Sequence, residues 1–231
     1  MTTVVLFDID GTLLSSAGAG RTAMETALEA VFGTRGPSGY RYDGKTDPLI
    51  VRESMRHAGL DDATIEAGMD AVLAHYLEGL AAGLRDPARL ARVLPGVPAL
   101  VDAVHAADDL MLGLLTGNVV EGATLKLDAV GLAPDRFVVG AFGSDHAHRP
   151  ALAPVAQARA EARLGRPIPG DRFVIIGDTP ADLTCGRGIG ARAIGVATGG
   201  YRRAELEGYD AYALVDDLAD TSGILELIRG A

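Results

Sequence analysis

The chain has one cysteine, only two lysines and more acidic than basic residues among its 231 positions. A single cysteine excludes a disulfide within the chain. The net charge of −10 and an isoelectric point of about 4.9 argue against a nucleic-acid or anionic-membrane partner. No apolar run reaches membrane-spanning length, and no targeting segment opens the sequence. We therefore expect a cytoplasmic protein, a monomer or a small homo-oligomer.

Hydrophobic residues make up 48% of the chain, which is ample for a core. Short apolar runs that end in polar or glycine-rich turns alternate with helix-like stretches, and this rhythm predicts a parallel sheet with right-handed crossovers. Such α/β sheets gather their ligands at the carboxyl ends of the strands. The expected strands are residues 4–7, 110–115, 137–139, 173–176 and 193–197, and the expected helices are 97–106, 119–130, 152–164 and 180–188.

The segment after the first strand breaks this rhythm, because it has no evident strand pattern. It reads as three helices, over residues 20–32, 48–58 and 61–83. We interpret residues 16–89 as a small α-helical insert, and residues 1–15 together with 90–231 as a doubly wound α/β core.

Two carboxylates end the first apolar run. Asp8 follows Val4–Phe7 directly, Asp10 comes two residues later, and Gly11-Thr12 is next. A continuous apolar run is typical of a buried parallel strand, so Asp8 is expected at its carboxyl end. Buried charge needs compensation, and a hard cation such as Mg²⁺ takes oxygen ligands from a few carboxylates. A turn cap would explain Asp10 but not Asp8.

The stretch Asp8-Ile9-Asp10-Gly11-Thr12-Leu13 resembles the first motif of the haloacid dehalogenase superfamily, most of whose members are phosphatases. The resemblance implies that Asp8 is a nucleophile that becomes an aspartyl phosphate. It implies that Asp10 is a general acid/base whose backbone carbonyl also binds the metal. It further implies that the helical insert is a cap over the active site of a Rossmann-like core.

Leu114-Leu115-Thr116-Gly117-Asn118 resembles the second motif of the family, in which a hydroxyl binds the transferring phosphoryl group. A hydroxyl and backbone N–H groups at a helix start suit a phosphate. Thr116 is therefore a candidate catalytic residue, and Gly117 and Asn118 are candidate substrate-binding residues. Capping of the following helix is an alternative role for Thr116, compatible with the first.

Ile176-Gly177-Asp178-Thr179-Pro180-Ala181-Asp182 resembles the fourth motif. The resemblance implies that Asp178 completes the metal site, and that Asp182 orients the ligands around the metal. The alternative is that Asp178 is only a turn residue before a helix that starts with proline.

The third motif departs from the family pattern, which has a lysine before a proline at a place held here by Arg149-Pro150. Arg149 matches by position, and Arg suits bidentate phosphate binding. Lys126 matches by residue type, and its side chain is expected to point back along its helix toward Thr116. We favour Lys126 as the phosphoryl-binding cation, with Arg149 at the cap-facing rim. Either one could instead be an ordinary surface or helix-start residue.

Within the insert, Asp43-Gly44-Lys45-Thr46-Asp47-Pro48 is a glycine-bearing loop that opens a helix. It resembles the cap loop that contacts the non-phosphate part of the substrate, so Lys45 and Thr46 are candidate specificity residues. A plain surface turn is the alternative. Arg21 is a further candidate, at the hinge of the cap.

Taken together, the motifs imply a Mg²⁺-dependent phosphatase that acts on a small phosphorylated metabolite, similar to the phosphoglycolate phosphatase group. Asp8, Asp10, Thr116 and one of the two cations would carry the chemistry. A phosphosugar mutase is the alternative enzyme, and a catalytically silent binding module of the same fold is the alternative from another class. A dehalogenase or a phosphonate hydrolase is disfavoured by Asp10.

Overall fold

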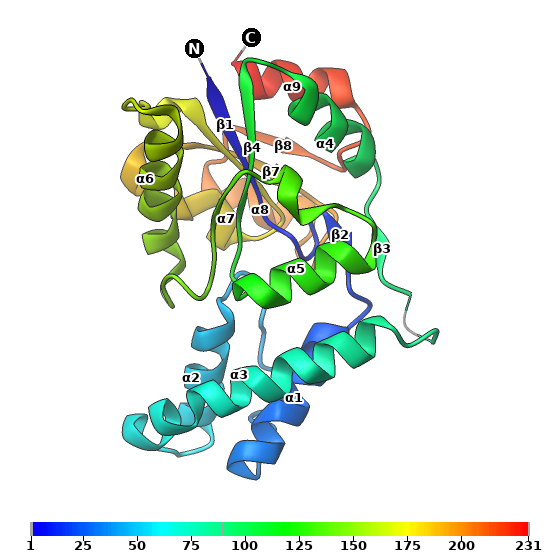
Figure 1. The fold of residues 1–231 in the computed structure, drawn as a ribbon, viewed down its shortest axis with the longest axis vertical. Helices are drawn as coiled ribbons and strands as arrows, with labels where there is room; N and C mark the ends of the chain where they lie inside the picture. The colour runs from blue at the N-terminus through cyan, green and yellow to red at the C-terminus, as the bar shows by residue number, and fades with distance from the viewer. Residues whose placement is uncertain (1, 89, 231) are drawn as a thin grey trace.

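The computed structural model describes residues 2–88 and 90–230 and shows a central sheet with three helices below it (Figure 1). The sheet has six strands in the order β5-β4-β1-β6-β7-β8, and each neighbouring pair is parallel. The strands are β1 (Thr3–Phe7), β4 (Leu110–Leu115), β5 (Val139–Ala141), β6 (Phe173–Gly177), β7 (Arg192–Val196) and β8 (Ala213–Val215).

Helices cover both faces of this sheet, and β1 shows why. Val5 and Phe7 pack into one hydrophobic cluster, while Val4 and Leu6 pack into another, because successive side chains of a strand point to opposite faces. The first cluster is shared with α4 (Val97–Ala106), α5 (Val120–Ala129) and α9 (Thr221–Arg229), and the second with α6 (Leu152–Leu164) and α7 (Pro180–Cys185).

The doubly wound α/β fold expected from the sequence is confirmed. The limits of β4, α4 and α6 agree with the expected residues, and β8, α8 (Arg203–Leu206) and α9 are additions. Helix α7 ends at Cys185, earlier than expected, because Gly186 leads into a 3₁₀ turn. The 3₁₀ turns are Pro134–Arg136, Arg149–Ala151, Gly170–Arg172, Arg187–Ile189 and Glu207–Tyr209. None of the helices within the described residues has the length and apolar character needed to cross a membrane.

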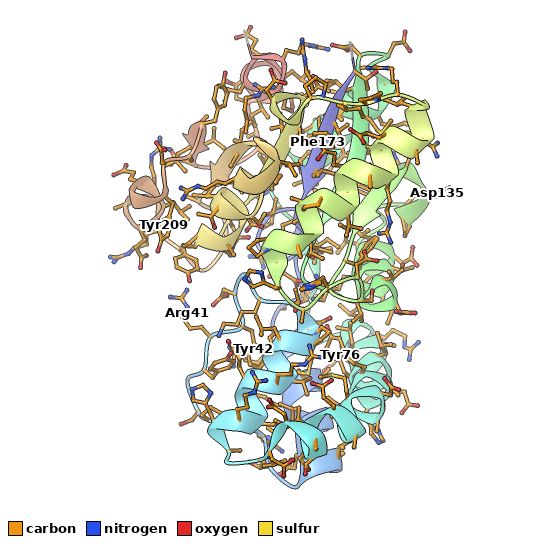
Figure 2. The ribbon with its side chains drawn as sticks, turned by 90° about the vertical axis from the view of Figure 1, so that its left-hand side faces the viewer. Arg41, Tyr42, Tyr76, Asp135, Phe173 and Tyr209 are labelled. Atoms are coloured by element: carbon orange, nitrogen blue, oxygen red, sulfur yellow. The ribbon has the colours of Figure 1, made fainter. Side chains whose placement is uncertain are left out.

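The three helices of the insert are α1 (Ala19–Phe32), α2 (Asp47–His57) and α3 (Asp62–Leu84). Local sequence sets their ends: the Thr46 and Asp61 side chains cap α2 and α3, and Gly33 ends α1 in the left-handed conformation. The helices pack around a hydrophobic cluster of their own. Figure 2 shows Tyr76, which belongs to this cluster, and Tyr42, which is partly buried and packs against it.

The insert joins the core through two segments that pair with each other. Strand β2 (Leu14–Ser15) runs antiparallel to β3 (Arg92–Val93), with Leu14 opposite Val93 and Ser15 opposite Arg92. This two-residue ladder was not expected, because two residues carry no periodic pattern. The domain limits proposed above remain a prediction, and their limits at residues 1, 89 and 231 lie outside the described residues.

Candidate active site

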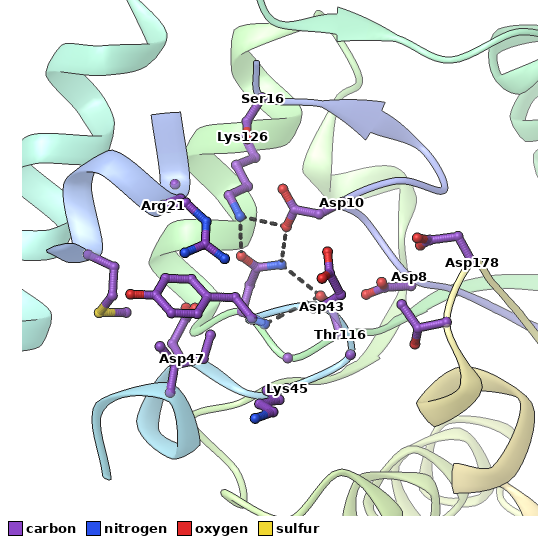
Figure 3. Close-up of a pocket in the computed structure, with 18 of the residues that line it drawn as sticks. Asp8, Asp10, Ser16, Arg21, Asp43, Lys45, Asp47, Thr116, Lys126 and Asp178 are labelled. Carbon is purple, nitrogen blue, oxygen red and sulfur yellow. Dashed lines mark hydrogen bonds and ion pairs between the residues drawn. The ribbon is translucent and has the colours of Figure 1, made fainter. Parts of the chain in front are cut away.

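A cavity of about 200 Å³ lies between the carboxyl ends of the strands and the insert (Figure 3). Asp8 follows β1, Thr116 follows β4 and Asp178 follows β6, so three neighbouring strands deliver one polar side chain each to the same edge. Arg21 and Lys45 approach from the insert. Residues far apart in the sequence therefore line one cavity, as the strand pattern predicted.

The carboxylate of Asp8 is held by a buried cation. Asp8 Oδ1 lies 3.1 Å from an amino nitrogen of Arg149, and both side chains are less than a tenth exposed. The same nitrogen donates a short hydrogen bond to Asp182, whose second oxygen accepts from Thr179. Asp182 and Thr179 also form the capping box that starts α7. Arg149 is thus locked between the nucleophile candidate and a helix cap.

The carboxylate of Asp178 sits in a cradle of backbone. Its Oδ1 accepts a 3.0 Å hydrogen bond from Thr12, a residue whose role the sequence did not reveal. A Cβ at Gly11 would lie 2.5 Å from Asp178 Oδ2, and one at Gly199 would lie 1.7 Å from it. Gly11 also adopts φ +80°, which glycine tolerates best. Both glycines are required for the loops to close around this acid.

The acids of this site fit a divalent metal ion. Among the described residues, Asp8, Asp178 and Asp182 each place a carboxylate oxygen so that the three lie within 4.8 Å of one another. Because both Asp182 oxygens already accept hydrogen bonds, Asp8 and Asp178 are the freer donors. Burial raises the pKa of Asp8 to about 6, and burial with the charges of Asp182 and Asp8 raises that of Asp178. A hard cation would relieve this crowding of negative charge.

A second buried cation holds Asp10. Lys126 Nζ lies 2.5 Å from Asp10 Oδ2 and 2.6 Å from the amide oxygen of Asn118. The Asn118 amide nitrogen donates to Asp10 at 2.9 Å and to the Thr116 hydroxyl at 2.8 Å. Figure 3 shows this chain of contacts across the cavity. Burial alone would lower the pKa of Lys126, but nearby Asp10, Tyr76 and Asp47 raise it, so the ammonium stays charged.

The insert touches the core through the loop before α2. The Asp47 backbone N–H donates to Gly117 O at 2.8 Å, and its carboxylate accepts from the Val119 N–H at 2.9 Å. The Thr46 hydroxyl donates to Ala147 O at 2.7 Å. A Cβ at Gly117 would lie 2.1 Å from Lys45 O, so only glycine permits this close approach. The loop therefore seals one side of the cavity.

The structure differs from two expectations about these residues. Arg149 does not lie at the cap-facing rim: it is buried beside Asp8, because its 3₁₀ turn packs against α7. The Thr46 hydroxyl is occupied by its helix cap and by Ala147, whereas Lys45 lines the cavity and pairs with Glu53 at 2.8 Å. Asp47 was not proposed for any role, and only its place beside a proline at a helix start could have suggested one.

A known protein family matches the part of the chain that contains these motifs. A family model described as haloacid dehalogenase-like hydrolase matches residues 5–187. The chain belongs to this family. The match spans the segments that contain Asp8, Thr116 and Asp178, so the resemblance inferred from the motifs is confirmed, as is the enzyme class, a hydrolase of the haloacid dehalogenase type.

This haloacid dehalogenase-like hydrolase has relatives in both sequence and structure. It is 24% identical to a phosphoglycolate phosphatase of Pseudomonas syringae pv. tomato over 221 residues, covering 93% of this chain and 76% of the relative. A hydrolase from Pseudomonas syringae superposes with a TM-score of 0.74 at 24% identity, with 98% of each chain covered. CbbY from Rhodobacter sphaeroides, in complex with xylulose-(1,5)bisphosphate, gives 0.72 at 22% identity, covering 95% of this chain and 96% of its own.

Proposed function

We propose that this hydrolase is a Mg²⁺-dependent phosphatase that cleaves a small phosphomonoester through an aspartyl phosphate on Asp8. The observation that carries the proposal is the pairing of two acids with two buried cations at one sheet edge. Asp8 faces Arg149, and Asp10 faces Lys126, in a single cavity. The named phosphoglycolate phosphatase relative supports the reaction class.

The reaction divides between the two acids. A carboxylate oxygen of Asp8 attacks phosphorus, and the bond from phosphorus to the ester oxygen breaks. Asp10 gives its proton to the leaving alcohol. Asp10 then takes a proton from water, which attacks the phosphorus of the aspartyl phosphate and frees inorganic phosphate and Asp8. One residue serves both as acid and as base because the two steps are opposite in proton demand.

Asp8, Asp178 and the Asp10 backbone carbonyl would hold the Mg²⁺. When bound, the ion would neutralise negative charge on the phosphoryl oxygens. Asp182 orients Arg149, and Thr179 orients Asp182 in turn. The first ligand shell is thereby braced by groups whose hydrogen bonds are complete.

The remaining residues would position the phosphoryl group. Thr116, Gly117 and Asn118 line the same cavity as Asp8, and Figure 3 shows Thr116 close to Asp8. We propose that Lys126 offsets charge near the leaving oxygen while it holds Asp10, and that Arg149 does so beside Asp8. Lys45 would bound the leaving-group side.

The test is release of inorganic phosphate from a panel of phosphomonoesters, with Mg²⁺ and with excess EDTA. We expect release in Mg²⁺ that stops with chelator and returns when Mg²⁺ is restored. Full activity in EDTA would contradict the metal site. Failure with every ester in Mg²⁺ would contradict the phosphatase, and would favour a binding module if no phosphate moves between positions of a substrate either.

The same panel of esters distinguishes a phosphatase from the alternative enzyme, a phosphosugar mutase. A mutase would move phosphate between positions of a hexose phosphate, with little inorganic phosphate released, and ³¹P spectra of the reaction distinguish the two results. The cytoplasmic location and the monomeric or small homo-oligomeric state remain predictions, the latter open to light scattering on the purified protein.

A further inference from the structure

We propose that Arg21 selects the substrate by binding a second anionic group, a carboxylate or a phosphate, carried by the alcohol part of the ester. The inference rests on the proposed phosphatase function and deepens it. The substrate class would then be short phosphomonoesters with two anionic groups, one at the sheet edge and one at the start of α1.

The other charged groups on the insert side of the cavity are already engaged. Lys45 pairs with Glu53 and lies 3.9 Å above the Tyr40 ring. Asp43 pairs with Arg41 at 3.1 Å, and the Asp47 carboxylate accepts from Val119. Lys45, Asp43 and Asp47 therefore line the cavity with charges that already have partners within the protein.

Arg21 is held differently: its neighbours fix the plane of the guanidinium but use only some of its N–H donors. Its guanidinium stacks 4.1 Å from the centre of the Tyr42 ring. One nitrogen donates to Tyr40 O at 2.8 Å, and another donates to Glu25, which does not line the cavity, at 3.1 Å. These bonds use two of the five N–H donors of a guanidinium. A planar fork that is held in advance suits a carboxylate or a phosphate, and holding it lowers the entropic cost of binding.

Besides Asp8 and Asp178 at the sheet edge, three acids line the same cavity, and none of them pairs with Arg21, whose partly exposed partner Glu25 lies outside it. Asp10 is offset by Lys126, and Asp43 by Arg41. Asp47 lies near Lys126, whose charge offsets that of the carboxylate, and it accepts a hydrogen bond from the Val119 N–H. The anion-binding capacity of Arg21 therefore remains available to a ligand.

The start of α1 lies close to Lys126, and this limits the space left for a substrate. Gly20, next to Arg21, would place a Cβ 3.5 Å from Lys126 Nζ, so the start of α1 closes directly on the catalytic cation. Figure 3 shows Arg21 and Lys126 on the same side of the cavity. Both anionic groups of the substrate must fit in the cavity of about 200 Å³, so we expect a compact leaving group.

The experiment compares three esters that differ only in the distal group: ethyl phosphate, phosphoglycolate and ethylene glycol bisphosphate. The matched variants are Arg21→Gln and Arg52→Gln. Arg52 on α2 pairs with Glu66 at 2.5 Å, as Arg21 pairs with Glu25, but both Arg52 and Glu66 lie outside the cavity. Arg21→Lys tests whether charge alone suffices.

We expect the wild-type enzyme to prefer a charged ester over ethyl phosphate. Arg21→Gln should shrink that preference by about 10- to 100-fold, the worth of one charged hydrogen-bonding contact, mainly through KM. Arg52→Gln should retain the preference, and Arg21→Lys should restore part of it. The charged ester with the larger loss identifies the distal group as carboxylate or phosphate.

Equal kcat/KM for the three esters in the wild-type enzyme, or an undiminished preference in Arg21→Gln, would overturn the inference while the phosphatase proposal stands. Hydrolysis of none of the esters would overturn both. Because Arg21 lies on the surface of α1, thermal unfolding of each variant checks that any change does not come from misfolding; if Arg21→Gln unfolds early, Arg21→Lys carries the comparison.

Discussion

The two halves of the cavity are built in different ways. On the sheet side, Arg149 and Asp8 are 5% and 7% exposed, and each acid is tied to a buried partner. On the insert side, Arg21 and Glu25 are 42% and 32% exposed, and the loop is held by cation–π stacks and partly exposed ion pairs. Exposed pairs contribute little to stability, whereas buried ones are costly to disrupt. We therefore expect the chemistry on the buried half and recognition on the more exposed half.

The largest effect should come from Asp8. Asp8→Asn replaces the attacking oxygen with an amide and removes a metal ligand, so turnover should fall by more than about 10⁴-fold. Steady-state phosphate release on one small ester measures the loss. More than trace activity would show that Asp8 is not the nucleophile.

Asp10→Asn should have a smaller effect, since its metal contact is assigned to the backbone. We expect turnover to fall by roughly 10²- to 10⁴-fold, the usual contribution of a general acid/base. The Mg²⁺ concentration for half-maximal residual activity should stay within a few-fold of wild type. A near-normal rate would remove Asp10 from the mechanism.

The two buried cations should respond differently to truncation. Lys126→Ala leaves Asp10 with 40% of its side chain exposed, so it should lower turnover by about 10²- to 10³-fold with little loss of stability. Arg149→Ala strands Asp8 and Asp182 without a cation, so it should also cost about 3–5 kcal/mol in unfolding free energy. Turnover and urea denaturation of both variants test this contrast, with Arg136→Ala, which pairs with exposed Asp102, as the surface control. Normal turnover in Lys126→Ala with crippled Arg149→Ala would make Arg149 the sole phosphoryl cation.

The smallest expected effect is on stability, and it concerns Asp47, whose carboxylate joins the insert to the core. Burial raises the pKa of Asp47 from 3.8 to about 6, so the folded state favours the neutral acid. The stability this gives is complete below pH 3.8 and is lost as the pH rises through 6. Asp47→Asn stays neutral throughout, and its amide oxygen can still accept from Val119.

We therefore expect the unfolding free energy of Asp47→Asn minus that of wild type to rise between pH 4 and pH 6 and to level off above pH 7. The total rise should be roughly 1–3 kcal/mol, from a shift of about two pKa units. Urea denaturation at several pH values measures it. A difference that stays flat across this range would show that Lys126 compensates the Asp47 charge in full.

The sequence predicted the sheet half of the cavity better than the insert half, for a physical reason. Asp8, Thr116 and Asp178 each follow an apolar run, and parallel strands bring their carboxyl ends together whatever the loops do. The position of Arg149 was not predictable in this way, because its burial depends on contacts with Asp8 and Asp182, 141 and 33 residues away.

The contacts of the insert depend on how α2 packs in the folded protein, and no local sequence pattern predicts that packing. Lys45 was recognised as a cavity residue from its glycine-bearing loop, yet its pairing with Glu53 follows from the turn of α2 that brings position 53 beside it. Asp47 and Val119 meet only in the folded protein. Strand β8 and the ladder of β2 with β3 were missed because they are short, with three and two residues.

The ladder between β2 and β3 has a consequence for protein engineering. Ser15 lies opposite Arg92, so the chain leaves the core and returns to it at adjacent points. A two-residue Asn-Gly hairpin could join these positions in place of the helices, since antiparallel neighbours need no longer connection. The same junction would accept a helical insert of another size from a relative, and substrate range could change by exchange of one cassette without alteration of the catalytic sheet.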